Sequence, residues 1–253
     1  MIQLSYNKRV SDFIDSADVG GNIKNHPIEL QYLKSIDNSI SKAGINTGTV
    51  YPFAGNGGDM EESFRFNLLD PSQIKLDWLG TPSGWNFNKE GVKPNGVDNY
   101  CKLIIPVDST ADDLILMSYT NERVSRDEVD MGSQDLQSYI MTNGFGTFSG
   151  LFTNNYILKQ KRYNSNLVFK NGGNISFIGD TELTTESKSF ANLLTTNFYL
   201  FTYTDANPLI LGLDRPSSKR VQFIIISKNS ITEQKGEILS HEITVAQRGK
   251  GRI

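Results

Sequence analysis

The feature that most constrains the fold is a long succession of short apolar segments between residues 74 and 227. Turn-forming residues separate these segments, and no convincing helical periodicity lies between them. Many short strands with frequent turns are typical of an antiparallel β-sandwich rather than of alternating strand and helix units. The predicted strands are 74–79, 100–105, 113–119, 136–141, 146–152, 156–161, 166–170, 174–179, 197–204, 209–213 and 221–227.

Two places in this succession predict hairpins. The Asn-Gly-Gly segment at 171–173 stands between two apolar segments, which is a specific signal for a tight turn. Upstream, Trp85 and Phe87 alternate with polar residues, and Pro-Asn-Gly at 94–96 leads to a second apolar strand. This pattern indicates a hairpin-like corner in an all-β domain.

The chain begins with two predicted helices. Apolar residues recur at helical spacing over 5–17 and again from Pro27 to Gly44, where proline suits a first turn and glycine suits a C-terminal cap. Two such helices are too small to form a core of their own, so their apolar faces must pack on the β-domain or on a partner chain. The residues that we expect to make assembly contacts are Phe13, Ile14, Leu33 and Ile36.

A third helix is predicted near the end of the chain. Ser230 and Glu233 fit a capping box, in which each side chain satisfies a backbone donor. A short basic tail follows Ala246, and it is either a solvated end or a contact with an acidic neighbouring subunit through Arg248 and Lys250. We therefore divide the chain into a helical segment 1–46, a β-domain 47–228, and a C-terminal helix with its tail 229–253.

Composition is ordinary for a soluble globular protein. With 253 residues, 38% of them hydrophobic, the chain is large enough for a core without covalent staples. Its net charge of −3 gives no general attraction to nucleic acid or to an anionic membrane. The start has no apolar signal-peptide core and no segment is apolar enough to span a bilayer, so we expect synthesis in a reducing cytoplasm. The single cysteine, Cys101, lies in an apolar strand pattern and is expected to be buried and inert.

The sequence gives little support for a metal site or a phosphate-binding loop. The glycines of 55–58 are followed by carboxylates rather than by Lys-Ser/Thr, which excludes a P-loop. His26, Cys101 and His241 are too far apart in the sequence to suggest a zinc site. No cofactor is expected. Calcium stays an open alternative, because rim loops of such sandwiches can bind it through carboxylates, although the aspartates of 127–135 do not match EF-hand spacing.

Sugar binding would need an exposed aromatic surface beside polar groups. The candidate ligand-contacting residues are Trp78, Trp85 and Tyr100. The alternative interpretation is core packing, because aromatic side chains contribute strongly to cores and the strand alternation favours it.

Several short motifs follow one another along the chain: Val-Tyr-Pro-Phe-Ala-Gly at 50–55, Phe-Asn-Leu-Leu-Asp-Pro at 66–71, Gly-Trp at 84–85, Pro-Asn-Gly at 94–96, Asn-Tyr at 99–100, the strand 209–214 and the closing strand and helix from 223. In order and spacing they resemble the LamG-like, concanavalin A-like jelly-roll domains of virion structural proteins from tailed bacteriophages, including crAss-like phages. The resemblance covers roughly residues 28–252.

The resemblance implies an antiparallel jelly-roll β-sandwich with short helices at both ends. It also implies a virion structural protein of capsid, neck, tail or fibre, located in the virion, that acts as a homo-oligomer through contacts with other virion proteins. The alternative is a carbohydrate-binding or host-adhesion module on a virion fibre, with a host glycan as its partner.

An enzyme is not expected. Glucanases that share this fold carry Glu-x-Asp-x-Glu or Glu-x-Asp-x-x-Glu on one strand, with one carboxylate as nucleophile and another as general acid. Glu128-Val-Asp130 begins such a motif, but Gly132 or Ser133 stands where the third carboxylate belongs. We expect 122–130 to be a solvated loop. A divergent hydrolase that uses Glu128 is a third hypothesis.

Overall fold

The protein is described by a computed structural model. It describes residues 7–108, 113–122, 128–133, 138–142, 147–150, 157–159, 163–171, 174–180, 182–187, 194–201 and 217–252.

Two antiparallel six-stranded sheets form the centre of the molecule. The first sheet has the order β1-β14-β5-β10-β11-β12 and the second has the order β4-β13-β6-β7-β8-β9, while β2 and β3 form a separate hairpin. Strands of the first sheet are β1 Thr49–Tyr51, β5 Ile115–Tyr119, β10 Ser165–Asn171, β11 Asn174–Gly179, β12 Glu182–Ser187 and β14 Phe223–Ser227. The remaining strands are β2 Asn86–Asn88, β3 Gly91–Lys93, β4 Cys101–Asp108, β6 Glu128–Ser133, β7 Ser138–Thr142, β8 Thr147–Gly150, β9 Ile157–Lys159 and β13 Leu194–Leu200.

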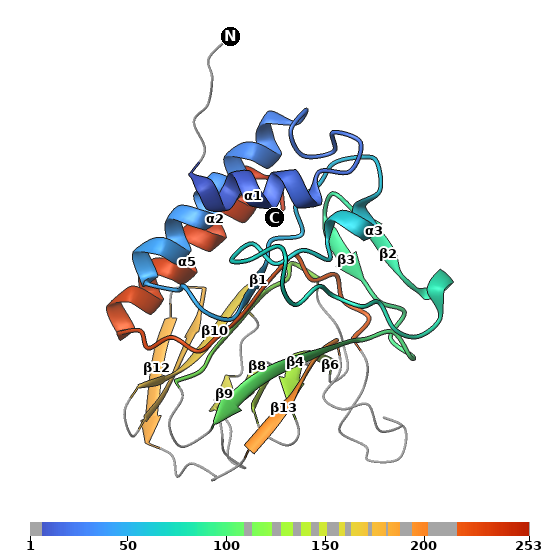
Figure 1. The fold of residues 1–253 in the computed structure, drawn as a ribbon. Coiled ribbons are helices and arrows are strands. Elements are labelled where there is room, and N and C mark those ends of the chain that lie inside the picture. The colour runs from blue at the N-terminus through green and yellow to red at the C-terminus, as the bar shows by residue number, and fades with distance from the viewer. Residues whose placement is uncertain are drawn as a thin grey trace.

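Three long helices cover one face of the first sheet (Figure 1). They are α1 Lys8–Ala17, α2 Pro27–Ala43 and α5 Glu233–Gly249, and two short pieces, α3 Met60–Ser63 and the 3-10 turn Pro82–Gly84, lie in the connections. The helix α2 has the boundaries that the sequence predicts: Pro27 opens it, and Gly44 adopts φ 83° at its C-terminal cap. Such a left-handed cap favours glycine, because a Cβ there is strained.

Strand alternation explains why the first sheet is buried on both faces. Along β5, Ile115 and Met117 face the helices, whereas Leu116 faces the second sheet. The helices, the first sheet and the second sheet therefore form three layers with two hydrophobic cores between them. The helical ends share the first core with the sheet, because Leu33 of α2 and Leu239 of α5 belong to the same buried cluster as Met117.

The sequence located most strands but erred at particular places. Segment 74–79 forms no strand beyond a single bridge between Leu79 and Tyr100. The strands β6 and β12 were not predicted, because their sequences are polar or charged. The β10–β11 hairpin is confirmed, with Asn171 opposite Asn174. The predicted strand 209–213 lies outside the described residues.

Two turn predictions were also displaced. The β2–β3 hairpin turns between Asn88 and Gly91, not at 94–96. Gly91 has φ 124°, and a Cβ there would lie 2.4 Å from the Val221 carbonyl oxygen, so only glycine fits. The cap of α5 is Thr232, whose hydroxyl accepts from the Lys235 amide, rather than Ser230. None of the helices in the described part of the chain has the length and apolar character of a membrane span.

Candidate functional site

The most specific surface chemistry in the described residues is a group of three aromatic side chains, which we call the aromatic surface: Trp78, Trp85 and Phe87. Their ring centroids lie 4.9 Å apart for Trp78 and Phe87, 5.1 Å for the two tryptophans and 5.9 Å for Trp85 and Phe87. All three are partly buried and pack against the core between the sheets, which leaves the remainder of each ring at the surface. The surface thus combines a fixed hydrophobic base with accessible ring area.

Local contacts hold the two tryptophans in different ways. The Trp78 indole nitrogen donates to the Glu61 carbonyl oxygen at 3.1 Å. Trp85 packs edge-on against Phe201, with centroids 5.6 Å apart, and its buried indole nitrogen has no hydrogen-bond partner in the described part of the chain. Trp78 therefore has a satisfied polar atom, whereas the Trp85 nitrogen carries a desolvation cost.

Arg220 fastens the β2–β3 hairpin that presents Phe87. Its guanidinium donates to the Asn86 side-chain and backbone oxygens, to Asn88 Oδ1 and to the Gly91 carbonyl oxygen, at 2.7–3.3 Å. Because a planar guanidinium offers five donors in a fixed fork, one side chain can hold both strands of the hairpin. Arg220 thereby fixes the Asn86 and Asn88 side chains on one face of β2, and because side chains alternate along a strand, Phe87 faces the other side.

The loop on the other side of the aromatic surface is held by Asp98. Its carboxylate accepts from the Thr81 amide and hydroxyl and from the Asn95 side chain. Hydrogen bonds from Thr81 and Asn95 lower the pKa of Asp98, so the carboxylate stays charged and keeps the loop closed.

The structure brings Trp78 and Trp85 together but gives Tyr100 a different neighbour. Tyr100 pairs its backbone with Leu79, the residue after Trp78, while its ring lies 6.3 Å from that of Tyr199. Sequence analysis missed Phe87 as a member of the surface, although its alternation with Trp85 was visible. It also missed Arg220, which comes from a distant segment and has no local signal.

The residues expected to make assembly contacts lie inside the chain's own core. Phe13 is 1% exposed, Leu33 and Ile36 are fully buried, and Ile14 is 8% exposed. Of the two alternatives that the sequence left open, packing on the β-domain is the one that buries their apolar faces. Contact with a partner chain is therefore not needed to bury them, and the assignment of these four residues as assembly contacts is wrong.

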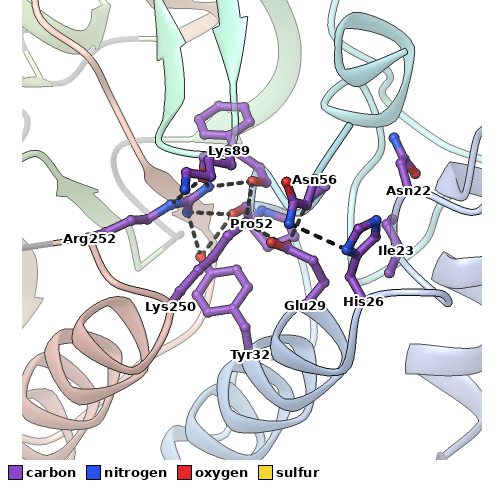
Figure 2. Close-up of polar contacts among 12 residues, drawn as sticks. Asn22, Ile23, His26, Glu29, Tyr32, Pro52, Asn56, Lys89, Lys250 and Arg252 are labelled. Atoms are coloured by element: carbon purple, nitrogen blue, oxygen red, sulfur yellow. Dashed lines mark hydrogen bonds and ion pairs between the residues drawn. The ribbon is translucent and has the colours of Figure 1, made fainter. Parts of the chain in front are cut away.

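The prediction for the basic tail, a solvated end or a subunit contact through Arg248 and Lys250, is also corrected for Lys250. Arg248 is exposed, but Lys250 forms a buried ion pair with Glu29 of α2 and also donates to the Phe53 carbonyl oxygen (Figure 2). Burial and the neighbouring Arg252 lower the pKa of Lys250 to about 7, against the opposing effect of Glu29. Lys250 therefore fastens the end of α5 to α2 instead of reaching toward another subunit.

Arg252 completes this fastening. It is fully buried, and its guanidinium donates to backbone oxygens of four residues in three separate segments, two of which can be followed in Figure 2. The acceptors are the carbonyl oxygens of Lys89, Phe53, Gln222 and Pro52. Since Lys89 lies in the β2–β3 turn, the same arginine links the aromatic hairpin to the helical layer.

A second buried polar group lies between the two sheets, and we call it the inter-sheet cluster: Ser118, Glu128, Asp130, Ser217, Ser218 and Lys219. Lys219 and Asp130 form an ion pair in which both side chains are fully buried. The prediction that 122–130 is a solvated loop is wrong at its end, because Glu128 and Asp130 lie on β6 and are 1% and 0% exposed.

Other features of the described residues point less clearly to a ligand or a reaction. A groove of about 440 Å³ runs between α2 and α5, and Ile28 and Val245 lie at its rim. Cys101 is buried as expected, and burial raises the pKa of its thiol. In the described part of the chain, no three His, Cys, Asp or Glu residues gather as a metal site would require.

Comparison with known proteins identifies the fold. No protein-family model matches the sequence, and no curated protein matches it either. Among solved structures, Trypanosoma rangeli sialidase, in complex with a difluorinated keto-deoxy-nononic acid, matches with a TM-score of 0.51 and 12% identity over 86% of this chain. Lower TM-scores of 0.42 and 0.39 relate 58% and 54% of the chain to botulinum neurotoxin type C and to mouse laminin α1 domains LG4-5, at 11% and 14% identity. The chain spans 38–40% of the length of these three proteins.

The sequence-based prediction that the chain is not an enzyme is corrected by this comparison. The sialidase reported above matches with a TM-score of 0.51, so the fold does not separate this chain from enzymes. At 12% identity the likeness concerns the fold alone and assigns no reaction. Together with the two antiparallel sheets, it confirms the predicted fold, an antiparallel jelly-roll β-sandwich of the concanavalin A-like type.

Proposed function

We propose that the chain is a carbohydrate-binding module that takes a sugar on the aromatic surface of Trp78, Trp85 and Phe87. The observation that carries this proposal is the cluster of three partly buried rings in mutual contact, packed on the core between the sheets. Sugar-binding sites combine ring faces that cover the apolar side of a sugar with a few fixed polar groups that orient its hydroxyls.

The fold guides the choice of ligands to test. The sialidase that shares the fold was solved with a sialic acid-like sugar bound. We therefore place sialylated glycans first among the candidates and neutral glycans second.

The binding experiment uses the full chain on a glycan array, followed by titration of the best ligand. Trp78→Ala is expected to weaken binding about tenfold, since stacking on one ring is worth roughly 1 kcal/mol or more. Trp78→Phe keeps an aromatic face and is expected to retain most of the affinity. Val97→Ala, which removes an exposed apolar side chain from the following loop, is the matched control and should bind as the parent does.

The proposal fails if the folded parent binds no glycan on the array, or if Trp78→Ala binds as tightly as Val97→Ala. Circular dichroism of each variant separates a loss of binding from a loss of folding.

We further propose that this module is carried on a virion, in a fibre or another adhesion component, on the strength of the motif resemblance to phage virion proteins. Mass spectrometry of purified particles tests the location: peptides of this chain should be present at a fixed ratio to the major capsid protein. Their absence from particles would remove the virion setting while leaving the glycan experiment unaffected.

A further inference from the structure

The inter-sheet cluster has a composition that ordinary core packing does not require. Lys219 and Asp130 are fully buried, in direct contact, and come from positions 89 residues apart. A second carboxyl group, that of Glu128, is 1% exposed and lies on the same strand as Asp130. Burying two carboxyl groups and an amine is costly in a β-sandwich core, where apolar residues of similar volume pack equally well.

The surroundings orient each reacting group. Asp130 lies at the bulge where β6 shifts register against β7, and its Oδ1 contacts the Lys219 amine while its Oδ2 accepts from the Ser118 hydroxyl at 2.8 Å. Glu128 accepts from the Ser218 amide at 2.7 Å and from the Ser218 hydroxyl at 2.6 Å. Glu128 is thereby held beside the residue that precedes Lys219.

We propose that Lys219 and Asp130 condense into an intramolecular amide, a covalent crosslink between β6 of the second sheet and the segment that leads into β14 of the first. The Lys219 Nζ forms a bond to Asp130 Cγ, and the bond from Cγ to Oδ1 breaks. Starting from the ion pair, the amine gives up two protons and the carboxylate gives up one oxygen, and together they leave as water. The reaction needs no oxidant, reductant or cofactor.

The cluster supplies the features that this step requires. Contact between amine and carboxyl group gives a high effective concentration. Complete burial of both side chains excludes the water that would hydrolyse the product. The Ser118 hydroxyl is placed to stabilise the oxygen that becomes negative in the tetrahedral intermediate. Glu128 is assigned as the acid–base group that carries the proton from the amine to the leaving oxygen.

Intact-mass spectrometry of the purified full chain tests the crosslink without any substitution. The expected result is a mass one water molecule below the sequence mass, and a peptide map in which Asp130 and Lys219 occur in one branched peptide. A full sequence mass overturns the proposal. A water loss that maps elsewhere, including to the other buried pair of Glu29 and Lys250, overturns it equally.

Two matched variants test the role of Glu128. Glu128→Gln keeps the size and the acceptor oxygen but removes the acid, so it is expected to show the full sequence mass. Glu122→Gln changes a carboxylate at the rim, where it pairs with Lys93 and Arg220, and should retain the loss of one water. If Glu128→Gln condenses as completely as Glu122→Gln, the assignment of Glu128 is overturned.

A melting experiment gives a second readout. An amide that closes a loop of this length lowers the entropy of the unfolded chain, so Glu128→Gln should melt on the order of 8 °C below Glu122→Gln. Equal melting temperatures, with the parent mass unreduced, would show that Lys219 and Asp130 are a simple ion pair.

Discussion

In the described part of the chain, the buried lysine–carboxylate pairs Glu29–Lys250 and Asp130–Lys219 have different surroundings. Glu29 and Lys250 join two helices, and their remaining hydrogen-bonding capacity is directed at backbone groups: Glu29 accepts from the Gly55 amide and Lys250 donates to the Phe53 carbonyl oxygen. Asp130 and Lys219 lie between the sheets, with side chains of other residues around them. The first pair therefore fixes the backbone of the loop at residues 53–55, whereas the second pair has the neighbouring side chains that a reaction would need.

The comparison shows that the charges and polar groups around a buried lysine differ sharply between the two pairs. Near Lys250 the cationic Arg252 and the lack of solvent both oppose a positive charge, which lowers the pKa of Lys250 to about 7. Near Lys219 the neighbouring groups are two carboxyl groups and hydroxyls. The four experiments below are ordered from the largest expected effect to the smallest.

The largest effect is expected from Asp130→Ala, which leaves the Lys219 amine buried without its carboxylate. Removing one partner of a buried pair costs roughly 3–5 kcal/mol of the free energy of unfolding. Urea denaturation followed by fluorescence measures it. The double variant Asp130→Leu with Lys219→Met should recover only the part of the loss that comes from the unpaired buried amine, because it also lacks the proposed crosslink. A single variant that loses under about 1 kcal/mol would show that water reaches the cluster.

Arg252→Ala comes next. It removes a charged donor from the backbone oxygens of Lys89, Pro52, Phe53 and Gln222. The Pro52 and Phe53 oxygens keep hydrogen bonds from Tyr32 and Lys250, so the loss falls mainly on Gln222 and Lys89. At roughly 1.5 kcal/mol for each lost charged hydrogen bond, about 3 kcal/mol is expected. The matched control is Arg248→Ala, an exposed arginine one turn earlier, which should change stability by less than about 0.5 kcal/mol. Equal effects of the two substitutions would contradict the fastening role of Arg252.

The pH dependence of stability tests the environment of Lys250. Its pKa is about 7 in the folded chain and 10.5 ordinarily, so between these values the unfolded chain binds more protons and stability rises with pH. The cost of burying the charge is fully present below pH 7. Relative to Lys250→Met, the parent should gain a few kcal/mol between about pH 7 and 10. Parallel pH profiles of the two proteins would disprove the shift.

The smallest effect is expected from Lys42→Ala. Lys42 and Glu242 also join α2 to α5, at 2.6 Å, but the lysine side chain is 61% exposed. Solvent screens such a pair, so its loss should cost less than about 1 kcal/mol and should shrink further in salt. Denaturation at low and high ionic strength measures this. A cost as large as that of breaking the Glu29–Lys250 pair would mean that exposure does not control pair strength here.

Turn chemistry and periodicity were sufficient for much of the fold. The helix from Pro27 to Ala43 was predicted with correct boundaries and the strands of the β10–β11 hairpin to within one residue, because both depend on residues close together in the chain. β6 was missed for the opposite reason. Its Glu128 and Asp130 look solvated in sequence, and their burial is tolerable because Ser118, Lys219 and the two serines before Lys219 contact them.

The candidate site shows the same division. Trp78 and Trp85 were recognised as candidates from their residue type alone, but their contact with each other depends on how segment 74–79 packs across the hairpin. Arg220 and Arg252, which hold that hairpin, carry no signal in their own neighbourhood.

The sequence by itself determined that this is a layered antiparallel β-protein with helical ends, since apolar spacing and turn residues act over a few positions. Only the tertiary structure decided which charges are buried, because the burial of a charge is stable when partners from distant segments meet it. For that reason two cations of the predicted basic tail are buried: the Lys250 side chain is 2% exposed and Arg252 is fully buried.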